Sequence, residues 1–215
     1  MDVPEIALRR LCEIARLLER LTAAGRVIIF SDEIGEKTGI PPYQVRKDIS
    51  YLGEIGTPGR GYQIQDLHAH IVTSLELSAK QPAVLVGVGR LGSALLNYVN
   101  LAKANITYVA AFDNDPRKIG HEENGVPIMS GTELVTFLKK RAVTTAVLTV
   151  PQDTAQEVFD QLVTGGVTAV LNFAPVSLII PAGVVVRNID FSLEIRVLSA
   201  VRSLKRGTIR RKKKA

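Results

Sequence analysis

Residues 84–96 read VLVGVGRLGSALL, and this stretch determines how the rest of the chain is interpreted. An apolar run, typical of a strand covered on both faces, leads directly into Gly87, Gly89 and Gly92 at the spacing G-x-G-x-x-G. Gly87 permits a tight turn, Gly89 lets backbone N–H groups approach a pyrophosphate, and Gly92 lets the following helix pack closely on the strand. The pattern predicts a dinucleotide-binding turn at a helix N-terminus, where free N–H groups favour anions. The predicted phosphate-binding segment consists of Gly87, Val88, Gly89, Arg90, Leu91 and Gly92.

An acidic residue follows at the distance that a dinucleotide site requires. Asp113 ends a second apolar run, ITYVAAFD (residues 106–113), 21 residues after Gly92. Its carboxylate is expected to accept hydrogen bonds from the adenosine ribose, and it would repel a 2′-phosphate. NAD(H) is therefore favoured over NADP(H). The alternative is a set of packing glycines with no ligand.

Strand-like and helix-like segments alternate through the rest of the chain. Apolar runs at residues 125–129, 144–150, 168–174 and 183–188 are separated by helical patterns. The alternation predicts an α/β fold with a Rossmann-like, doubly wound parallel sheet. Because ligands of such sheets bind at the carboxyl ends of strands, the nicotinamide end is expected near two of these ends. The residues there are Thr149, Val150, Pro151, Asn172, Phe173, Ala174 and Pro175.

The sequence offers no well-placed acid–base group for a dehydrogenase. The histidine of this segment, His121, lies in the polar loop GHEEN soon after Asp113, and the segment ends before a substrate domain could form. Hydride transfer then lacks its proton partner, which favours a cofactor sensor over an enzyme. A competing hypothesis remains open: an NAD(H)-binding enzyme or a CoA-binding domain, with the N-terminal helices serving only dimerisation.

The segment in front of the turn has the pattern of a small helical domain. A helix with one apolar face is predicted between Pro4 and Gly25, and two short helices are predicted within residues 31–39 and 42–52. Two short helices joined by a tight turn are typical of a helix-turn-helix. The second has a buried stripe of Val45, Ile49 and Leu52. Its other side chains are expected to contact bases or phosphates of double-stranded DNA: Gln44, Arg46, Lys47, Ser50 and Tyr51.

A glycine-rich stretch, GEIGTPGRGYQI (residues 53–64), follows the second short helix. It resembles the wing of a winged helix, a hairpin with Arg60 at its tip. Arg60 is expected to enter a minor groove or to touch phosphate. The alternative for the whole segment is an ordinary three-helix domain with a solvated basic face.

Charge and composition restrict the remaining function classes. The net charge of +6 comes from the last fourteen residues, which carry eight Lys and Arg and no Asp or Glu, so DNA binding must be argued from local arrangement. The absence of a long apolar run and of a secretory pattern predicts a cytoplasmic protein without a membrane partner. No metal site is expected, because His68 and His70 lie two residues apart on different helix faces and the chain has one cysteine.

Several stretches together resemble the Rex family of redox-sensing transcriptional repressors. They run over most of the chain up to about Leu204: VPEIALRRL, QVRKDISYLGEIGTPGRGY, VGVGRLGSAL, FDNDPRKIG, LTVP, LNFAP and NIDF. The resemblance implies a homodimer, not an enzyme, that binds a palindromic operator and releases it when NADH binds. The chain departs from the family pattern at Leu52, Ile55 and Arg60, and the change at Arg60 bears on operator preference.

The resemblance also implies a division of the chain. Residues 1–78 would form the winged-helix DNA-binding domain, residues 79–190 the Rossmann domain, and residues 191–215 a C-terminal helix that swaps onto the partner subunit, with a basic tail. An apolar stripe in that helix has the character the swap requires. The stripe consists of Phe191, Ile195, Leu198, Val201 and Leu204.

Three polar residues are carried over from the family as a switch. Arg16, Tyr98 and Asp190 would form a relay that differs between NAD⁺ and NADH. The oxidised nicotinamide is cationic and the reduced one is neutral, so a carboxylate such as Asp190 and an apolar wall such as Phe191 would distinguish them. A sensor requires such a difference, because equal affinity for both conformations shifts no equilibrium.

Overall fold

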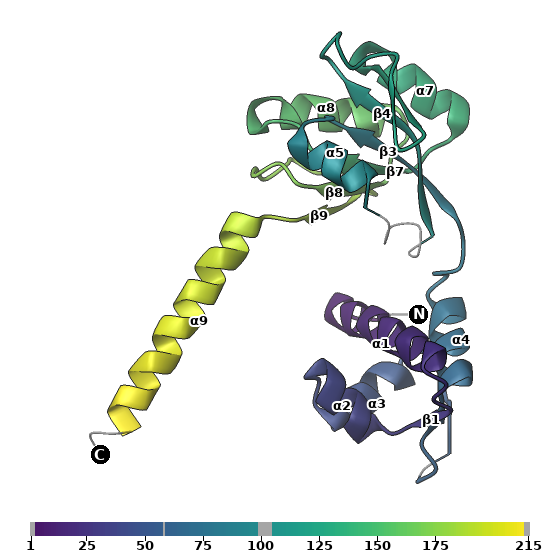
Figure 1. Ribbon diagram of the computed structural model, residues 1–215, viewed down its shortest axis with the longest axis vertical. Helices are drawn as coiled ribbons and strands as arrows, with labels where there is room; N and C mark the ends of the chain where they lie inside the picture. The colour runs from purple at the N-terminus through teal and green to yellow at the C-terminus, as the bar shows by residue number, and fades with distance from the viewer. Residues whose placement is uncertain (1–2, 58, 99–104, 213–215) are drawn as a thin grey trace. The chain divides into compact units, whose positions relative to one another are not determined.

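The computed structural model describes residues 3–57, 59–98 and 105–212 of the chain (Figure 1). The chain divides into two compact units, residues 1–79 and residues 80–215. Each unit buries its own apolar side chains: one cluster in the first unit and two in the second.

The first unit is helical with a small two-stranded sheet. Its elements are α1 (Glu5–Ala23), β1 (Ile28–Ile29), α2 (Ser31–Thr38), α3 (Pro42–Ser50), β2 (Tyr62–Gln63) and α4 (Ile64–Ser74). Gly39 ends α2 in the left-handed conformation with φ of 75°, and Pro42 starts α3, where a missing N–H costs nothing. These two residues produce the tight turn between α2 and α3 that the sequence predicts.

All four of these helices contribute to one core. Ile14 and Leu18 of α1 pack with Ile34 of α2 and with α4. The predicted buried stripe is confirmed, because Val45 and Ile49 of α3 and Leu52 in the turn after it are at most 5% exposed. Burial of one such aliphatic side chain contributes about 1.5–3 kcal/mol.

The wing differs from the expected local hairpin. β2 pairs antiparallel with β1, so that Ile29 lies opposite Tyr62, and the described residues between Gly53 and Gly61 form no strand. This pairing requires glycine at position 61, because a Cβ there would lie 2.9 Å from the carbonyl oxygen of Ile29. The wing is therefore a loop closed by a strand from before α2.

The second unit contains a seven-stranded sheet in the order β5-β6-β4-β3-β7-β8-β9, parallel except for the β5–β6 pair. The predicted α/β class with a doubly wound sheet is confirmed. The strands are β3 (Gln81–Val86), β4 (Ile106–Asp113), β5 (Glu122–Glu123), β6 (Val126–Ser130), β7 (Thr145–Leu148), β8 (Ala169–Asn172) and β9 (Val185–Asn188).

Helices cover both faces of this sheet (Figure 1). One face packs on α5 (Arg90–Leu96) through Leu85 and Ala111, and the opposite face packs on α7 (Leu134–Arg141) and α8 (Gln152–Thr164) through Val84 and Phe112. Successive strand residues thus enter different cores, which accounts for the continuous apolar runs in the sequence. The strand order reverses between β3 and β7, so their carboxyl ends flank a crevice of the kind that binds ligands.

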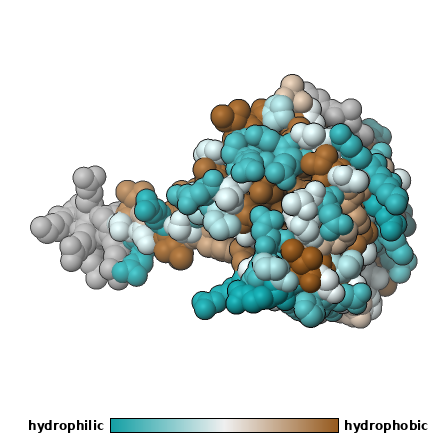
Figure 2. Space-filling model, turned by 90° about the horizontal axis from the view of Figure 1, so that it is seen from above, coloured by the Kyte–Doolittle hydropathy of each residue, from teal (hydrophilic) through white to brown (hydrophobic). Residues whose placement is uncertain are grey.

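The chain ends in a long helix whose apolar face is uncovered in the single chain. α9 (Phe191–Lys212) has exposed side chains at every described position from Phe191 to Lys205. Figure 2 shows both apolar and hydrophilic side chains on the segment that projects at the left of the view. No helix within the described ranges is long and apolar enough to cross a membrane.

Candidate functional site

The glycine-rich turn between β3 and α5 is held by close backbone packing. Gly87 has φ of 97°, and its N–H donates to the carbonyl of Phe112 at 2.8 Å. A Cβ on Gly92 would lie 2.1 Å from the carbonyl oxygen of Gly87, whereas a Cβ on Gly89 would meet nothing within 4 Å. Gly87 and Gly92 are therefore required by the fold, and Gly89 borders open space where a ligand can approach the backbone.

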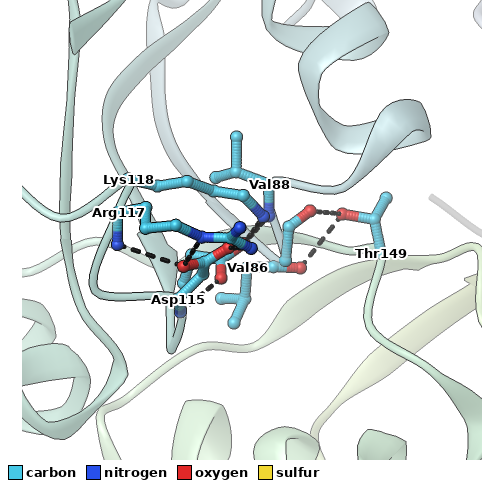
Figure 3. A network of polar contacts seen from close by, with 8 residues as sticks. Val86, Val88, Asp115, Arg117, Lys118 and Thr149 are labelled. Carbon is cyan, nitrogen blue, oxygen red and sulfur yellow. Dashed lines mark hydrogen bonds and ion pairs between the residues drawn. The ribbon is translucent and has the colours of Figure 1, made fainter. Parts of the chain in front are cut away.

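Thr149 joins this turn to the end of β7. Its hydroxyl lies 3.0 Å from the carbonyl oxygen of Val86 and 2.7 Å from that of Gly87, and its N–H donates to Val86 at 2.9 Å (Figure 3). The side chain of Thr149 therefore fixes the turn from the neighbouring strand. Sequence reasoning assigned Thr149 only to the nicotinamide end.

Asp113 connects the end of β4 to the same turn. One carboxylate oxygen accepts the N–H of Val88 at 2.8 Å and the ammonium of Lys118 at 3.0 Å, and the other accepts the N–H of Asp115 at 2.8 Å. Figure 3 shows Val88 and Lys118 converging at this point. Burial alone would raise the pKa of Asp113, but these donors outweigh it and lower the pKa.

The charge of Asp113 is therefore partly neutralised by the protein itself. Lys118 lies beside the carboxylate that was expected to repel a 2′-phosphate, so this repulsion is weaker than the sequence alone predicts. The ribose contact of Asp113 remains a prediction.

A second ion pair organises the loop after β4. Arg117 donates from Nε and Nη2 to the two carboxylate oxygens of Asp115 at 3.0 and 2.8 Å (Figure 3). The hydrogen bonds from the Arg117 side chain and backbone lower the pKa of Asp115 to about 2. Because the Arg117 side chain is 87% exposed, this ion pair is a surface contact next to the glycine turn.

A cavity of about 1050 Å³ lies along the crevice between β3 and β7. Its volume is sufficient for an extended dinucleotide. The predicted residues that line it are Gly87, Gly89, Arg90, Leu91, Asp113, Thr149, Val150 and Pro151.

The cavity also has lining residues that sequence reasoning missed. Asn114 follows β4, Gly131 and Thr132 follow β6, and Glu157 and Gln161 lie on α8. Gly131 and Thr132 could have been predicted from the sequence. They directly follow an apolar run, and the carboxyl ends of parallel strands carry ligand sites. Glu157 and Gln161 give no comparable signal, since a polar residue on a helix face is ordinary.

The other predicted nicotinamide-side residues lie outside the described lining of this cavity. Asn172 is fully buried, and its amide shapes the following loop by donating to the carbonyls of Ala174 and Val176 and to Asn188. Its side chain therefore serves the fold in this structure. The ring of Phe173 lies 6.3 Å from that of Phe191 between centroids, and Ala174 and Pro175 belong to the loop after β8.

Asp190 lies immediately before α9 and holds its first turn. One carboxylate oxygen accepts the N–H and the hydroxyl of Ser192 at 2.8 and 2.6 Å and the N–H of Leu193 at 3.2 Å. These hydrogen bonds, led by that of the Ser192 hydroxyl, lower the pKa of Asp190. Tyr98 is half exposed. Since Arg16 belongs to the first unit and Tyr98 and Asp190 to the second, the predicted relay stays a prediction.

Polar side chains of α3 and the wing form the candidate nucleic-acid interface. Arg46, Lys47, Ser50 and Arg60 are exposed, whereas Gln44 and Tyr51 are partly buried. Arg46 donates to the hydroxyl of Ser31 at the start of α2 at 2.7 Å, and the Ser50 hydroxyl donates to the carbonyl of Lys47 at 2.7 Å. The exposed cations suit phosphate contact, and the start of α3 is where a recognition helix reaches base edges.

Comparisons with known proteins cover both units. The family described as "CoA binding domain" matches residues 78–176, and the family described as "Putative DNA-binding protein N-terminus" matches residues 2–50. The redox-sensing transcriptional repressor Rex of Desulfitobacterium hafniense is 41% identical over 199 residues, 93% of this chain and 95% of that protein. The Rex protein of Streptomyces coelicolor is 37% identical over 205 residues, 95% of this chain and 80% of that protein.

Solved structures are similar over the full length. The crystal structure of RSP in complex with β-NAD⁺ and operator DNA matches with a TM-score of 0.90 at 29% identity, covering 99% of this chain and 98% of that one. The crystal structure of RSP in complex with β-NADH matches with a TM-score of 0.87 at 27% identity, covering 98% of both chains.

Proposed function

The chain belongs to the Rex family of redox-sensing transcriptional repressors, and we propose that it is a homodimeric, cytoplasmic repressor that reads the NADH/NAD⁺ ratio. It binds a palindromic operator in double-stranded DNA and leaves the operator when NADH binds. The observation that carries this proposal is the coexistence of two sites in one chain: an exposed basic reading helix in the first unit and a glycine turn beside a large cavity in the second. The similar RSP structures contain, between them, operator DNA, NAD⁺ and NADH.

The dinucleotide is proposed to lie along the crevice. Its pyrophosphate would rest on the turn from Gly87 to Gly92, with the adenosine toward Asp113 and the nicotinamide toward Thr149 and the loop after β8. The open space at Gly89 and the N–H groups at the start of α5 support this placement. Because α5 follows the turn without a side-chain cap, its first N–H groups are suited to an anionic ligand.

Asp190 offers a physical route from cofactor to dimer. Its carboxylate holds the first turn of α9, the helix proposed to swap onto the partner subunit. A cationic nicotinamide would attract this carboxylate and a neutral one would not. Any shift of Asp190 therefore changes the start of α9, and through the dimer it changes the spacing of the two reading helices. Affinity for the operator depends on that spacing, because the two half-sites lie one helical turn of DNA or a multiple apart.

We propose that the chain senses NADH without turning it over, as expected of a family of repressors. Incubation with NADH and a panel of small carbonyl compounds should leave the absorbance of NADH unchanged. Sustained oxidation that depends on one of these compounds would favour the enzyme alternative.

The decisive experiment titrates NADH into the protein bound to a fluorescent palindromic operator and follows anisotropy. Release is expected as NADH saturates the site, with NAD⁺ causing much less release. CoA serves as the competing ligand, because the second unit matches a CoA-binding family. An operator complex that survives NADH at concentrations shown to saturate the protein, or that responds to CoA instead, would overturn the proposal.

A further inference from the structure

The reading helix contains a buried carboxylate. Asp48 lies in the last half of α3 and is fully buried. Burying a carboxylate is costly unless it is paired and hydrogen-bonded. Arg10 of α1 supplies that pairing from a residue 38 positions away, with Nε 2.5 Å from one carboxylate oxygen and Nη2 2.8 Å from the other. The pair fixes α3 against α1 in a two-point geometry.

Gln44 is the third member of this cluster. It lies one helical turn before Asp48, and its Nε2 donates to the carboxylate at 2.7 Å. An ionised carboxylate only accepts hydrogen bonds, so the NH₂ group of Gln44 must face Asp48 and its carbonyl cannot. The hydrogen bond to Asp48 raises the pKa of Arg10 above its already high value, so the guanidinium stays charged beside the carboxylate. Asp48 thus accepts from Arg10 and from Gln44 at once, which orients the amide.

A fixed amide presents a defined pattern at the start of the helix. One hydrogen of Nε2 is used by Asp48, and among the described residues the amide of Gln44 makes no other hydrogen bond. Its second N–H and its carbonyl form a donor next to an acceptor. That pair matches the N7 acceptor and the N6 donor that adenine shows in the major groove. Gln44 also lies in the N-terminal part of the helix, where recognition helices contact base edges.

We infer that Arg10 and Asp48 are positioning residues that hold Gln44 as an adenine-reading, specificity-determining residue. The inference rests on the proposed DNA-binding function and goes beyond it. Gln44 would contact the base. Arg10 and Asp48 would not touch DNA but would hold the Gln44 amide in the orientation that recognises adenine.

The test measures base preference in the absence of cofactor. Affinities of the full-length dimer are determined for a consensus operator, for versions with every base pair of the half-site replaced in turn, and for unrelated DNA. For Gln44→Ala, preference for adenine at one position per half-site should fall by about 5- to 150-fold, the usual range for one bidentate base contact. Affinity for unrelated DNA should change little.

The positioning role is tested with Asp48→Asn, whose amide can face either group of Gln44. The same adenine position should lose its preference, and the variant with both Gln44→Ala and Asp48→Asn should lose no more than Gln44→Ala alone. Arg10→Lys keeps the positive charge but not the two-point contact, so it should reduce the preference for adenine partially. This variant replaces Asp48→Asn in the test if Asp48→Asn unfolds. Arg26→Ala is the matched control, because it removes an exposed ion pair with Glu33 in the same unit.

Thermal unfolding confirms that each variant is folded. A folded Asp48→Asn and a folded Arg10→Lys with unchanged base preference would overturn the positioning role, and a preference for guanine at the Gln44 position would overturn the orientation of the amide. The outcome is separable from the proposed function, because release by NADH is measured independently on the wild-type operator complex.

Discussion

At the scale of single residues, Gly89 and Gly92 lie three positions apart in the glycine turn but differ in the space available for a side chain. A methyl group on Gly92 would meet the backbone of Gly87, whereas one on Gly89 would enter open space. Gly92→Ala is expected to destabilise the second unit by about 1–3 kcal/mol and to abolish NADH binding, because the clash is with backbone that cannot move aside cheaply. Thermal unfolding and a fluorescence titration with NADH measure the two effects.

Gly89→Ala is the matched variant. It should keep the unfolding temperature of the wild type while weakening NADH binding, since the added methyl group lies where the pyrophosphate is proposed to approach. A wild-type unfolding temperature for Gly92→Ala would contradict the packing argument, and unchanged NADH affinity for Gly89→Ala would contradict the placement of the ligand.

Asp113 gives a prediction for the dependence of stability on pH. Its pKa in the folded chain is lower than the ordinary value of 3.8, because three donors stabilise the ionised form. A group with a depressed pKa contributes stability above its unfolded value and loses that contribution as pH falls through its folded value. The difference in unfolding free energy between wild type and Asp113→Asn should therefore be constant from pH 7 to about pH 5 and should shrink below pH 4. Urea unfolding at a series of pH values tests this; a gap that stays constant to pH 2 would count against it.

At the scale of elements, α9 is a helix whose apolar side chains are exposed in the single chain. Leu198 is 68% exposed. Leu198→Lys should leave the fold of the single chain intact but weaken dimerisation by about 1,000-fold. Each of the two copies loses the burial of one Leu side chain, about 2 kcal/mol, so the dimer loses about 4 kcal/mol. Sedimentation at several protein concentrations measures the dissociation constant.

Ser199→Lys is the control for this prediction, because it adds the same charge one residue away from the apolar stripe. It should change dimerisation much less. Equal effects of the two substitutions would show that charge on the helix matters and that burial of Leu198 does not.

Elements with a strong local pattern could be predicted from the sequence, and those that depend on distant partners could not. β4 has the predicted bounds, Ile106–Asp113, because a strand covered on both faces is apolar throughout. The wing was wrong as a local hairpin, because its strand pairs with Ile28–Ile29, more than thirty residues earlier. Within the site, the same reasoning found the glycine turn and Asp113 but gave no indication of Lys118 beside it.

The link between Arg10 and Asp48 was missed for a related reason. Neither helical periodicity nor any motif states which cation will face a buried carboxylate 38 residues away. Gln44 was predicted as a DNA contact, but its orientation depends on this pairing and is visible only in three dimensions. The sequence therefore predicts on which helix face a side chain lies. The orientation of that side chain depends on its neighbours in three dimensions, which the sequence does not identify.

At the scale of the whole molecule, the basic C-terminus gives a prediction about salt. Ending the chain after Leu204 removes seven Lys and Arg and no acidic residue. The truncated protein should bind unrelated DNA more weakly, and its affinity should fall less steeply with salt, by about 0.9 in logarithmic slope for each phosphate that the tail no longer neutralises. Anisotropy at several salt concentrations measures the slope, and an unchanged slope would show that the tail does not contact DNA.

The exposed apolar stripe of α9 also makes the state of the protein depend on its concentration in the cell. The apolar side chains of α9 from Phe191 to Leu204 are exposed in the single chain. Under the proposed dimer they would be covered only on association, so the fraction of covered molecules would follow mass action. Newly synthesised copies diluted below the dissociation constant would display an apolar helix to chaperones and proteases and would be removed before reaching a promoter. Gene dosage and the rate of translation would then set a threshold for repression, separate from the metabolic signal.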